Sequence, residues 1–256
     1  MTGADPQQLR KALRQQLLCD RMLGVRDVPF RLAATPPSGS SKSSGATASA
    51  SDPAESADKA NRLRVLDDTQ VKGCTQCGLS TTRTQTVFGQ GDPNARLVFI
   101  GEAPGYEEDK KGEAFVGRAG QLLTKMIHAM GLSRDEVFIC NVLKCRPPSN
   151  RDPSADEILS CSPYLRDQLR IIRPEVMVAL GAPAAKTLLN TAQSIGKLRG
   201  RFHNYELGGP LDDEDTVPLM PTYHPAYLLR SPGEKAKAWE DLKMVMAKLG
   251  LVAPKR

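Results

Sequence analysis

The chain has 256 residues, of which 40% are hydrophobic and 25% charged, and its formal net charge is +6 at pH 7. This composition is typical of a globular protein with a sizeable core, and the mild basic excess is compatible with a polyanionic partner without identifying one. No apolar run reaches the roughly 18 residues that a membrane span needs, and the N-terminus lacks the apolar segment of a secretory signal. We therefore expect a cytoplasmic protein without membrane contact, in which grouped cysteines more often hold metal than form disulfides.

The first 60 residues divide into two parts of different composition. Residues 1–32 carry leucines at roughly helical spacing among arginines and lysines, which predicts a basic amphipathic N-terminal arm. The arm either docks a partner or contacts DNA, and the sequence leaves that partner unknown. Residues 33–60 are dominated by small and polar residues and cannot bury enough apolar surface to offset the entropy of ordering, so we expect a flexible linker. Residues 61–256 then form one compact domain.

That domain alternates apolar strand-like runs with helical patterns. The runs typical of buried strands are 96–101, 136–142, 175–181 and the first part of 217–225. Helices are expected over 119–132, from about Ser154 onward, over 182–190 and over 233–250. This alternation predicts an α/β fold, a three-layer α/β/α sandwich with a central, mainly parallel four-stranded sheet. In such sheets ligands bind beyond the carboxyl ends of the strands.

The loops after three of these strands carry the distinctive motifs. "GEAPGYEEDKKGEAFVGRAGQLL" follows the first strand, "NVLKCRPP" ends the second, and "HPAYLLR" follows the fourth. Each alone has an ordinary explanation, namely a tight turn, a solvated run of charges or a histidine in a turn. Together they place a glycine-rich backbone, an aromatic ring, an amide and an imidazole around one crevice. That combination suits a planar heterocycle held by stacking and by hydrogen bonds to its edge.

Five of the six cysteines lie in the predicted domain. Cys74 and Cys77 form a C-x-x-C pair, whose short span lets two thiolates reach one metal centre. A second pair has to come from Cys140, Cys145 and Cys161. Four thiolates can bind either Zn²⁺ or an iron–sulfur cluster, and spacing alone does not separate the two.

The three loop motifs resemble the signature segments of the iron–sulfur uracil-DNA glycosylases, family 4 of the uracil-DNA glycosylase superfamily. The resemblance runs from about Val71 to Gly250 and leaves out the N-terminal arm, the linker and a loop at 208–215 that resembles an insertion. It implies an enzyme of base excision repair that flips uracil out of single- or double-stranded DNA, hydrolyses its N-glycosidic bond and leaves an abasic site.

The resemblance also implies a 4Fe–4S cluster. Its ligands would be Cys74, Cys77, Cys145 and Cys161, whereas Cys140 would be a buried apolar residue of its strand. The role of the cluster would be to clamp loops close to the DNA.

Six residues are implied to contact or act on the base. Phe115 would stack on the uracil ring, Asn141 would read its edge with one acceptor and one donor, and the catalytic His224 would donate a hydrogen bond to O2. Otherwise Phe115 would be a core residue and Asn141 a strand-end cap.

Backbone N–H groups of the turn at Glu102 and Ala103 would contact O2 of the base. Ala103 stands where better-known uracil glycosylases have a water-orienting aspartate, so Glu102, the nearest carboxylate, is our candidate for electrostatic support or for orienting the water. Glu108 would crowd the C5 edge and exclude the thymine methyl group.

Four further residues are implied to contact DNA. Leu228 would be the apolar wedge that fills the hole left by the flipped base, and Arg118, Lys144 and Arg230 would meet phosphates. No histidine occupies the loop that becomes covalently attached to DNA in a related branch, and no lysine lies in the motifs as a Schiff-base nucleophile. We therefore expect a monomeric, monofunctional enzyme. The rival interpretations are a non-catalytic DNA-binding module of this fold and a nucleotide-binding protein, which would need a phosphate-binding fingerprint that "GEAPG" does not provide.

Overall fold

The computed structural model describes residues 53–208 and 215–252, all of which belong to the unit Ser49–Arg256. The predicted basic arm, and most of the predicted insertion at 208–215, lie outside the described residues. Helix α2 (Pro53–Leu66) begins inside the segment predicted as linker, so the predicted boundary at residue 60 is too late. The sequence of α2 is largely polar, but Leu63 and Leu66 are buried in the core. In the described part of the chain, no helix is both long enough and apolar enough to span a membrane.

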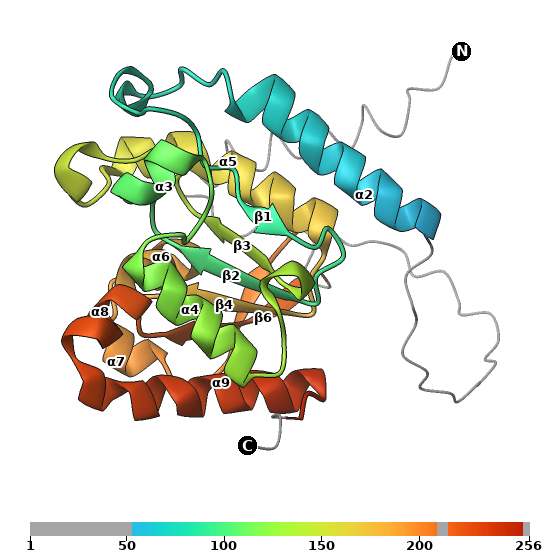
Figure 1. The fold of residues 1–256 in the computed structure, drawn as a ribbon, viewed down its shortest axis with the longest axis vertical. Coiled ribbons are helices and arrows are strands. Elements are labelled where there is room, and N and C mark those ends of the chain that lie inside the picture. Colours follow the sequence, from blue (N-terminus) through green and yellow to red (C-terminus); the bar gives the residue numbers. More distant parts are fainter. Residues whose placement is uncertain (1–52, 209–214, 253–256) are drawn as a thin grey trace, which may run out of the picture. The chain divides into compact units, whose positions relative to one another are not determined.

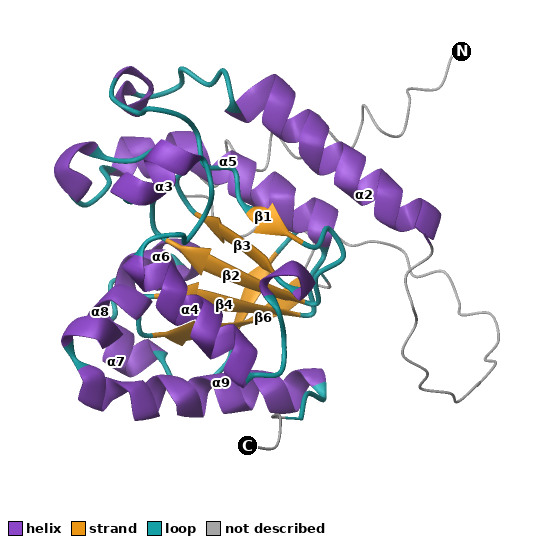
Figure 2. Ribbon diagram, viewed as in Figure 1, coloured by secondary structure: helices purple, strands orange, loops and turns teal. Residues whose placement is uncertain are grey.

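The centre of the domain is a six-stranded sheet in the order β1-β3-β2-β4-β6-β5 (Figure 2). The four predicted strands form its parallel middle, and they are β2 (Leu97–Gly101), β3 (Phe138–Asn141), β4 (Val176–Leu180) and β6 (Thr216–Thr222). The prediction of four strands was wrong because each edge adds an antiparallel strand, β1 (Gln90–Gly91) and β5 (His203–Glu206). β1 is only two residues long and β5 alternates half-buried with exposed residues, so neither contains an apolar run.

Helices cover both faces of this sheet, which confirms the three-layer α/β/α fold. Alternate strand residues point to opposite faces: Val98 and Ile100 belong to one buried cluster, Leu97 and Phe99 to the other. The first cluster includes residues of α2, α5 (Ala155–Ile172), α6 (Ala182–Leu189) and α7 (Ile195–Leu198). The second includes residues of α4 (Arg118–Ala129) and α9 (Lys235–Leu249), which lie in front of and below the sheet in Figure 1. Two short helices, α3 (Tyr106–Lys111) and α8 (Pro225–Arg230), follow β2 and β6.

Helix α5 begins next to Ser154, as the sequence predicted, and its start is fixed by a reciprocal cap that was not predicted. The Ser154 hydroxyl accepts from the Glu157 N–H at 3.3 Å, and a Glu157 carboxylate oxygen accepts from the Ser154 N–H at 2.8 Å. Arg151 forms two hydrogen bonds to the same carboxylate and holds the pKa of Glu157 at about 2. The cap fixes the residue at which α5 begins, and α5 carries Cys161.

The strand register brings the predicted loops to one edge of the sheet. Gly101 of β2 pairs with Asn141 of β3, and Leu180 of β4 pairs with Thr222 of β6. All four strands are parallel and end at this level, so the loops that follow them share one crevice.

Candidate active site and cysteine pocket

An open cleft of about 820 Å³ lies at the carboxyl ends of the parallel strands. Side chains from the loops after β2, β3, β4 and β6 line it. Seven of the predicted site residues contribute to this lining: Glu102, Ala103, Glu108, Phe115, Asn141, His224 and Arg230. The structure therefore brings together residues that are up to 128 positions apart, from Glu102 to Arg230.

Asn141 ends β3 with its side chain buried and incompletely paired. Only 2% of the residue is exposed, and its Oδ1 has no hydrogen-bond partner among the described residues. Gly101 makes room for it, because a Cβ at position 101 would collide with Asn141 Oδ1 and lie 2.6 Å from Phe115 Cζ. A buried acceptor without a partner costs free energy. Asn141 therefore presents an acceptor that suits an N–H group of a ligand.

The position of the Phe115 ring in the cleft is set by the conformation of its backbone and by hydrogen bonds to that backbone. Phe115 has a left-handed φ of 53°, which is uncommon for a bulky residue. Arg134 donates to the carbonyl oxygens of Phe115 at 3.2 Å and Ala114 at 2.8 Å. The Phe115 ring lies 5.7 Å from the His224 ring, tilted by 35°. Arg134 was not predicted, and nothing in its local sequence indicates a contact with a loop 19 residues away.

Glu108 supports the same loop from the other side. Its Oε1 accepts from the backbone N–H groups of Val116 and Gly117, each at 2.9 Å. Glu108 also lines the cleft, so one carboxylate fixes the aromatic loop and contributes a charge to the site.

His224 is half-buried at the start of α8, and its ring has a defined tautomer when neutral. Nδ1 accepts from the Ala226 N–H at 3.0 Å, so the proton of the neutral ring is on Nε2. Burial, followed by the positive charge of Arg230, lowers the pKa of His224 to about 4, while Glu108 partly opposes the shift. At neutral pH the imidazole is therefore an uncharged donor. Gly181, with φ of 92°, allows the close approach, since a Cβ there would lie 2.9 Å from His224 Cβ.

Glu102 is the second group in the cleft with an unpaired buried oxygen. Its Oε1 has no hydrogen-bond partner among the described residues. Burial, followed by the negative charge of Asp152, raises the pKa of Glu102 to about 7. A carboxylate with such a pKa can accept a proton from water near neutral pH. Ala103, which follows it, offers no side-chain acceptor in its place.

Two of the predicted DNA contacts were wrong. Leu228 is only 1% exposed, because α8 packs that side chain into the protein, so it does not form the wedge. The exposed apolar side chains of α8 are its neighbours Tyr227 and Leu229, each 37% exposed. Arg118 and Arg230 are exposed, and their contact with phosphates stays a prediction.

Lys144 is the other wrong assignment, since it is 1% exposed and does not reach the surface. Its Nζ donates to the Asn141 carbonyl oxygen at 2.8 Å and to Gln168 Oε1 at 2.5 Å. It also lies 5.9 Å from the centre of the Phe88 ring. Burial lowers the pKa of Lys144. This residue therefore holds the backbone of Asn141 instead of contacting DNA.

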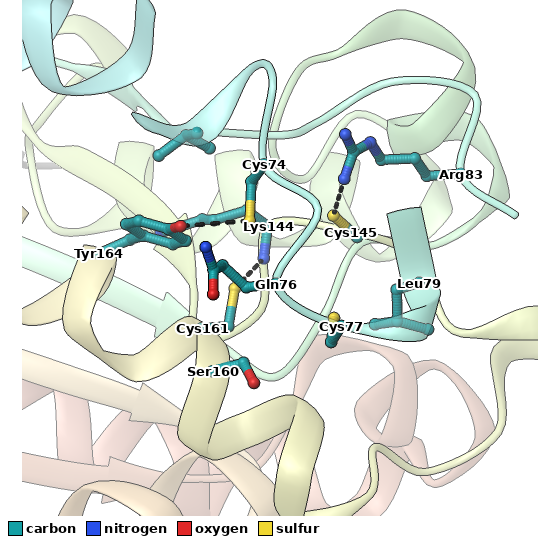
Figure 3. Close-up of a pocket in the computed structure, with 11 residues that line it drawn as sticks. Cys74, Gln76, Cys77, Leu79, Arg83, Lys144, Cys145, Ser160, Cys161 and Tyr164 are labelled. Atoms are coloured by element: carbon teal, nitrogen blue, oxygen red, sulfur yellow. Dashed lines mark hydrogen bonds between the residues drawn. The ribbon is translucent and has the colours of Figure 1, made fainter. Parts of the chain in front are cut away.

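The cysteines implied as ligands line a second pocket together (Figure 3): Cys74, Cys77, Cys145 and Cys161. Cys140 is not among them and lies buried in the core beside β1. Cys74 and Cys77 come from the loop after the turn Asp67–Val71, Cys145 from the loop after β3, and Cys161 from α5.

Three of the four sulfurs accept hydrogen bonds. Tyr164 donates to Cys74 at 3.1 Å, Arg83 to Cys145 at 3.2 Å, and the Lys144 N–H to Cys161 at 3.1 Å (Figure 3). Such donors favour thiolates, whereas burial raises the pKa of Cys145 and brings that of Cys161 to about 11.

The donor set has the chemistry of a soft metal site, since cysteine sulfurs bind zinc or an iron–sulfur cluster. No group of three or more His, Cys, Asp or Glu side chains in the described residues is arranged to hold a single metal ion. The four cysteines nevertheless line one pocket, which is consistent with their binding one metal group together.

Comparisons with known proteins agree with this geometry. Residues 88–243 match the family model described as the uracil DNA glycosylase superfamily. The chain is 47% identical over 163 residues to the type-4 uracil-DNA glycosylase of Thermotoga maritima, covering 63% of this chain and 81% of the relative. It is 45% identical over 181 residues to that of Sulfurisphaera tokodaii (69% and 80%), and 44% identical over 181 residues to that of Saccharolobus solfataricus (69% and 82%).

Proposed function

The chain belongs to the uracil DNA glycosylase superfamily, and we propose that it excises uracil from DNA by hydrolysing the N-glycosidic bond. The observation that carries this proposal is the buried, unpaired Oδ1 of Asn141 in the same cleft as the Phe115 ring and a neutral His224. The target base would be turned out of the stack into this cleft, at a cost of a few kcal/mol in a duplex and less in a single strand.

Recognition of uracil follows from the groups that face the cleft. Asn141 Oδ1 accepts from N3–H of uracil while the side-chain NH₂ donates to O4. Cytosine has the donor and acceptor exchanged at these positions, so it leaves a buried acceptor facing another acceptor. Phe115 stacks on the ring. Glu108 lies where crowding excludes the methyl group of thymine.

Catalysis stabilises the departing base. The C1′–N1 bond breaks, the oxygen of water bonds to C1′, and the base leaves as an anion that takes its proton from solvent. His224 donates Nε2–H to O2, where the negative charge collects, and remains a neutral donor because its pKa is about 4. Ionised Glu102 orients the water and accepts its proton, for which a pKa of about 7 is suitable.

We further propose that Cys74, Cys77, Cys145 and Cys161 hold a 4Fe–4S cluster. When bound, this group would clamp the loops that its ligands come from, and the hydrolysis needs no redox step from it. The four soft donors, three of them with N–H or O–H partners, suit such a cluster. Four thiolates also bind zinc, and it is the resemblance to the iron–sulfur glycosylases that favours the cluster over zinc. Purified protein with a broad absorbance near ~400 nm and iron by metal analysis is the expected result, and stoichiometric zinc without iron would contradict it.

The remaining assignments are part of the same proposal. The enzyme is a cytoplasmic monomer that acts on uracil in single- or double-stranded DNA. Residues 1–32 serve as a basic arm, and the linker that follows ends before α2 at Pro53. Arg118 and Arg230 contact phosphates. Among the described residues no lysine lines the cleft, which supports a monofunctional enzyme without lyase activity.

The deciding test is incubation of the purified protein with a single-stranded oligonucleotide that contains one uracil, without added metal or nucleotide. Excision should leave a site that alkali cleaves, and matched oligonucleotides with cytosine or thymine should remain intact. An intact cluster without any uracil excision would contradict the proposed function and favour a non-catalytic DNA-binding module.

A further inference from the structure

A tyrosine stands exposed beside the uracil cleft without a role in the chemistry. Tyr106 begins α3 and is 56% exposed. Among the described residues only one other aromatic side chain is comparably exposed, Tyr227 at 37%. Burying part of an aromatic ring is favourable by about 25 cal/mol per Å², so an exposed ring beside a ligand cleft is a candidate contact surface.

The Tyr106 ring is supported on one face by an arginine. The guanidinium carbon of Arg146 lies 5.2 Å from the ring centre, within the range of a cation–π contact. Arg146 Nε donates to Asn150 Oδ1 at 2.7 Å, which fixes the plane of the guanidinium. No hydrogen bond joins the two Nη atoms of Arg146 to another described residue, so they remain available to an anion.

Neighbours on both sides tie this pair to the rim of the cleft. Gly105, which precedes Tyr106, lines the cleft, and so do Pro147 and Asn150 on the segment of Arg146. Tyr106 and Arg146 are therefore each next in sequence to a residue that lines the cleft.

The order of the sheet places this pair opposite α8. Tyr106 follows β2 and Arg146 follows β3, whereas Tyr227 follows β6 on the far side of β4. The cleft lies between them. A strand of DNA that delivers a base into the cleft has neighbouring nucleotides on both sides of that base, and the β2–β3 side offers an aromatic ring and a guanidinium to one of them.

We propose that Tyr106 and Arg146 form a subsite for the nucleotide next to the flipped uracil, an inference that rests on the proposed function. The open face of Tyr106 stacks on the neighbouring base, which loses a stacking partner when uracil leaves the helix. The free Nη atoms of Arg146 donate to a phosphate of the same nucleotide. Stacking of a base on an aromatic side chain is tolerant of base identity, so the subsite adds affinity without sequence preference.

The test compares Tyr106→Ala with wild type on single-stranded oligonucleotides in which the base on the 5′ or the 3′ side of uracil is replaced by an abasic tetrahydrofuran residue. With all bases present, Tyr106→Ala should raise KM about 5-fold or more, with kcat nearly unchanged. When the base that stacks on Tyr106 is removed from the oligonucleotide, the KM of wild type should rise by the same factor, and the KM of Tyr106→Ala should not rise further. Tyr106→Trp should restore the wild-type KM.

Leu159→Ala is the matched control, because Leu159 is a 70% exposed apolar residue of α5 that does not line the cleft. It should leave KM unchanged, and thermal melting should show all three variants folded. A Tyr106→Ala defect that is equal with and without both neighbouring bases, or no defect at all, would overturn the subsite. Excision by wild type in the same series tests the proposed function separately. If wild type excises no uracil, the proposed function is refuted, whereas normal excision by wild type with no Tyr106 effect refutes only the subsite.

Discussion

The cleft and the cysteine pocket share the segment after β3 but differ in how completely their polar atoms are paired. In the cleft, Asn141 Oδ1 and Glu102 Oε1 are buried and without a partner among the described residues. In the cysteine pocket, three of the four sulfurs accept a hydrogen bond from a fixed donor. The cleft therefore has buried acceptors that a ligand can pair, whereas most of the sulfurs of the cysteine pocket are already held by hydrogen bonds.

Lys144 joins the two regions. Its backbone N–H donates to Cys161 and its ammonium donates to the Asn141 carbonyl. Asn141, which we propose reads the base, is thus anchored through one buried lysine to the cysteine pocket. If this comparison holds, substitutions in the cleft lower the rate of uracil excision without changing iron content. Substitutions in the cysteine pocket lower both the iron content and the rate of excision.

The largest effect is expected for His224→Ala. Removal of the neutral donor to O2 should lower kcat by about 100- to 1,000-fold without altering iron content, measured by single-turnover excision and metal analysis. His128→Ala is the control, since His128 is exposed on α4 and away from the cleft. Loss of iron in His224→Ala would contradict the separation of the two regions.

The pH dependence should be governed by Glu102. With a pKa of about 7 and an ionised form that accepts the proton of water, kcat/KM should rise about tenfold per pH unit below 7 and level off above it. His224 adds no second transition above pH 4. In Glu102→Gln the rate should be low and independent of pH between 5 and 8. If the pH dependence of kcat/KM in Glu102→Gln were the same as in wild type, Glu102 would not be the group that accepts the proton of water.

The same raised pKa makes a stability prediction. Because the folded pKa lies above the ordinary 4.5, the stability that protonated Glu102 contributes is complete below pH 4.5 and is lost as pH rises through 7. Thermal melting should therefore place Glu102→Gln above wild type at pH 8 and level with it at pH 4. An equal difference at both pH values would show that the effect is not due to titration.

A smaller loss of activity, about 10- to 100-fold, is expected for Cys145→Ala, together with loss of most of the iron. Excision should fall because Asn141 ends β3 and Cys145 lies in the loop that follows it, so loss of the proposed metal group would loosen the position of Asn141. The matched control is Cys140→Ala, which changes an equally buried cysteine that does not line the pocket. Loss of iron in Cys140→Ala would reassign the ligand set.

The smallest effect should come from Lys144→Met, a change of similar volume that removes the donor to the Asn141 carbonyl. We expect a rise in KM of about tenfold with iron retained, because an unpaired buried acceptor costs about 1–3 kcal/mol. Lys125→Met, at an exposed position of α4, is the control. If Lys144→Met kept the wild-type KM but lost iron, Lys144 would support the cysteine pocket and not Asn141.

The parallel centre of the fold was predictable because its strands are continuous apolar runs. The edge strands were not, since β1 is two residues long and β5 alternates in burial. Helix α2 was hidden by its polar composition. Among its residues whose burial is described, Leu63 and Leu66 are the ones that bury against the core.

In the site, residue types and motifs identified the groups that face the cleft, but they did not indicate how deeply each side chain is buried. Lys144 was expected at the surface because it is charged, and its burial depends on partners 3 and 24 residues away, Asn141 and Gln168. Leu228 and Leu229 are adjacent and alike in sequence, so which of them faces solvent is decided by the packing of α8. The support of Phe115 by Arg134 likewise arises only in the folded chain.

The central claim is that the unpaired acceptor of Asn141 reads uracil. Single-turnover excision from a uracil-containing single strand, compared between wild type and Asn141→Ala, tests it most directly. The account predicts rapid excision by wild type and a rate at least about 100-fold lower for Asn141→Ala, with unchanged iron content and melting temperature. Excision by Asn141→Ala at the wild-type rate would contradict it.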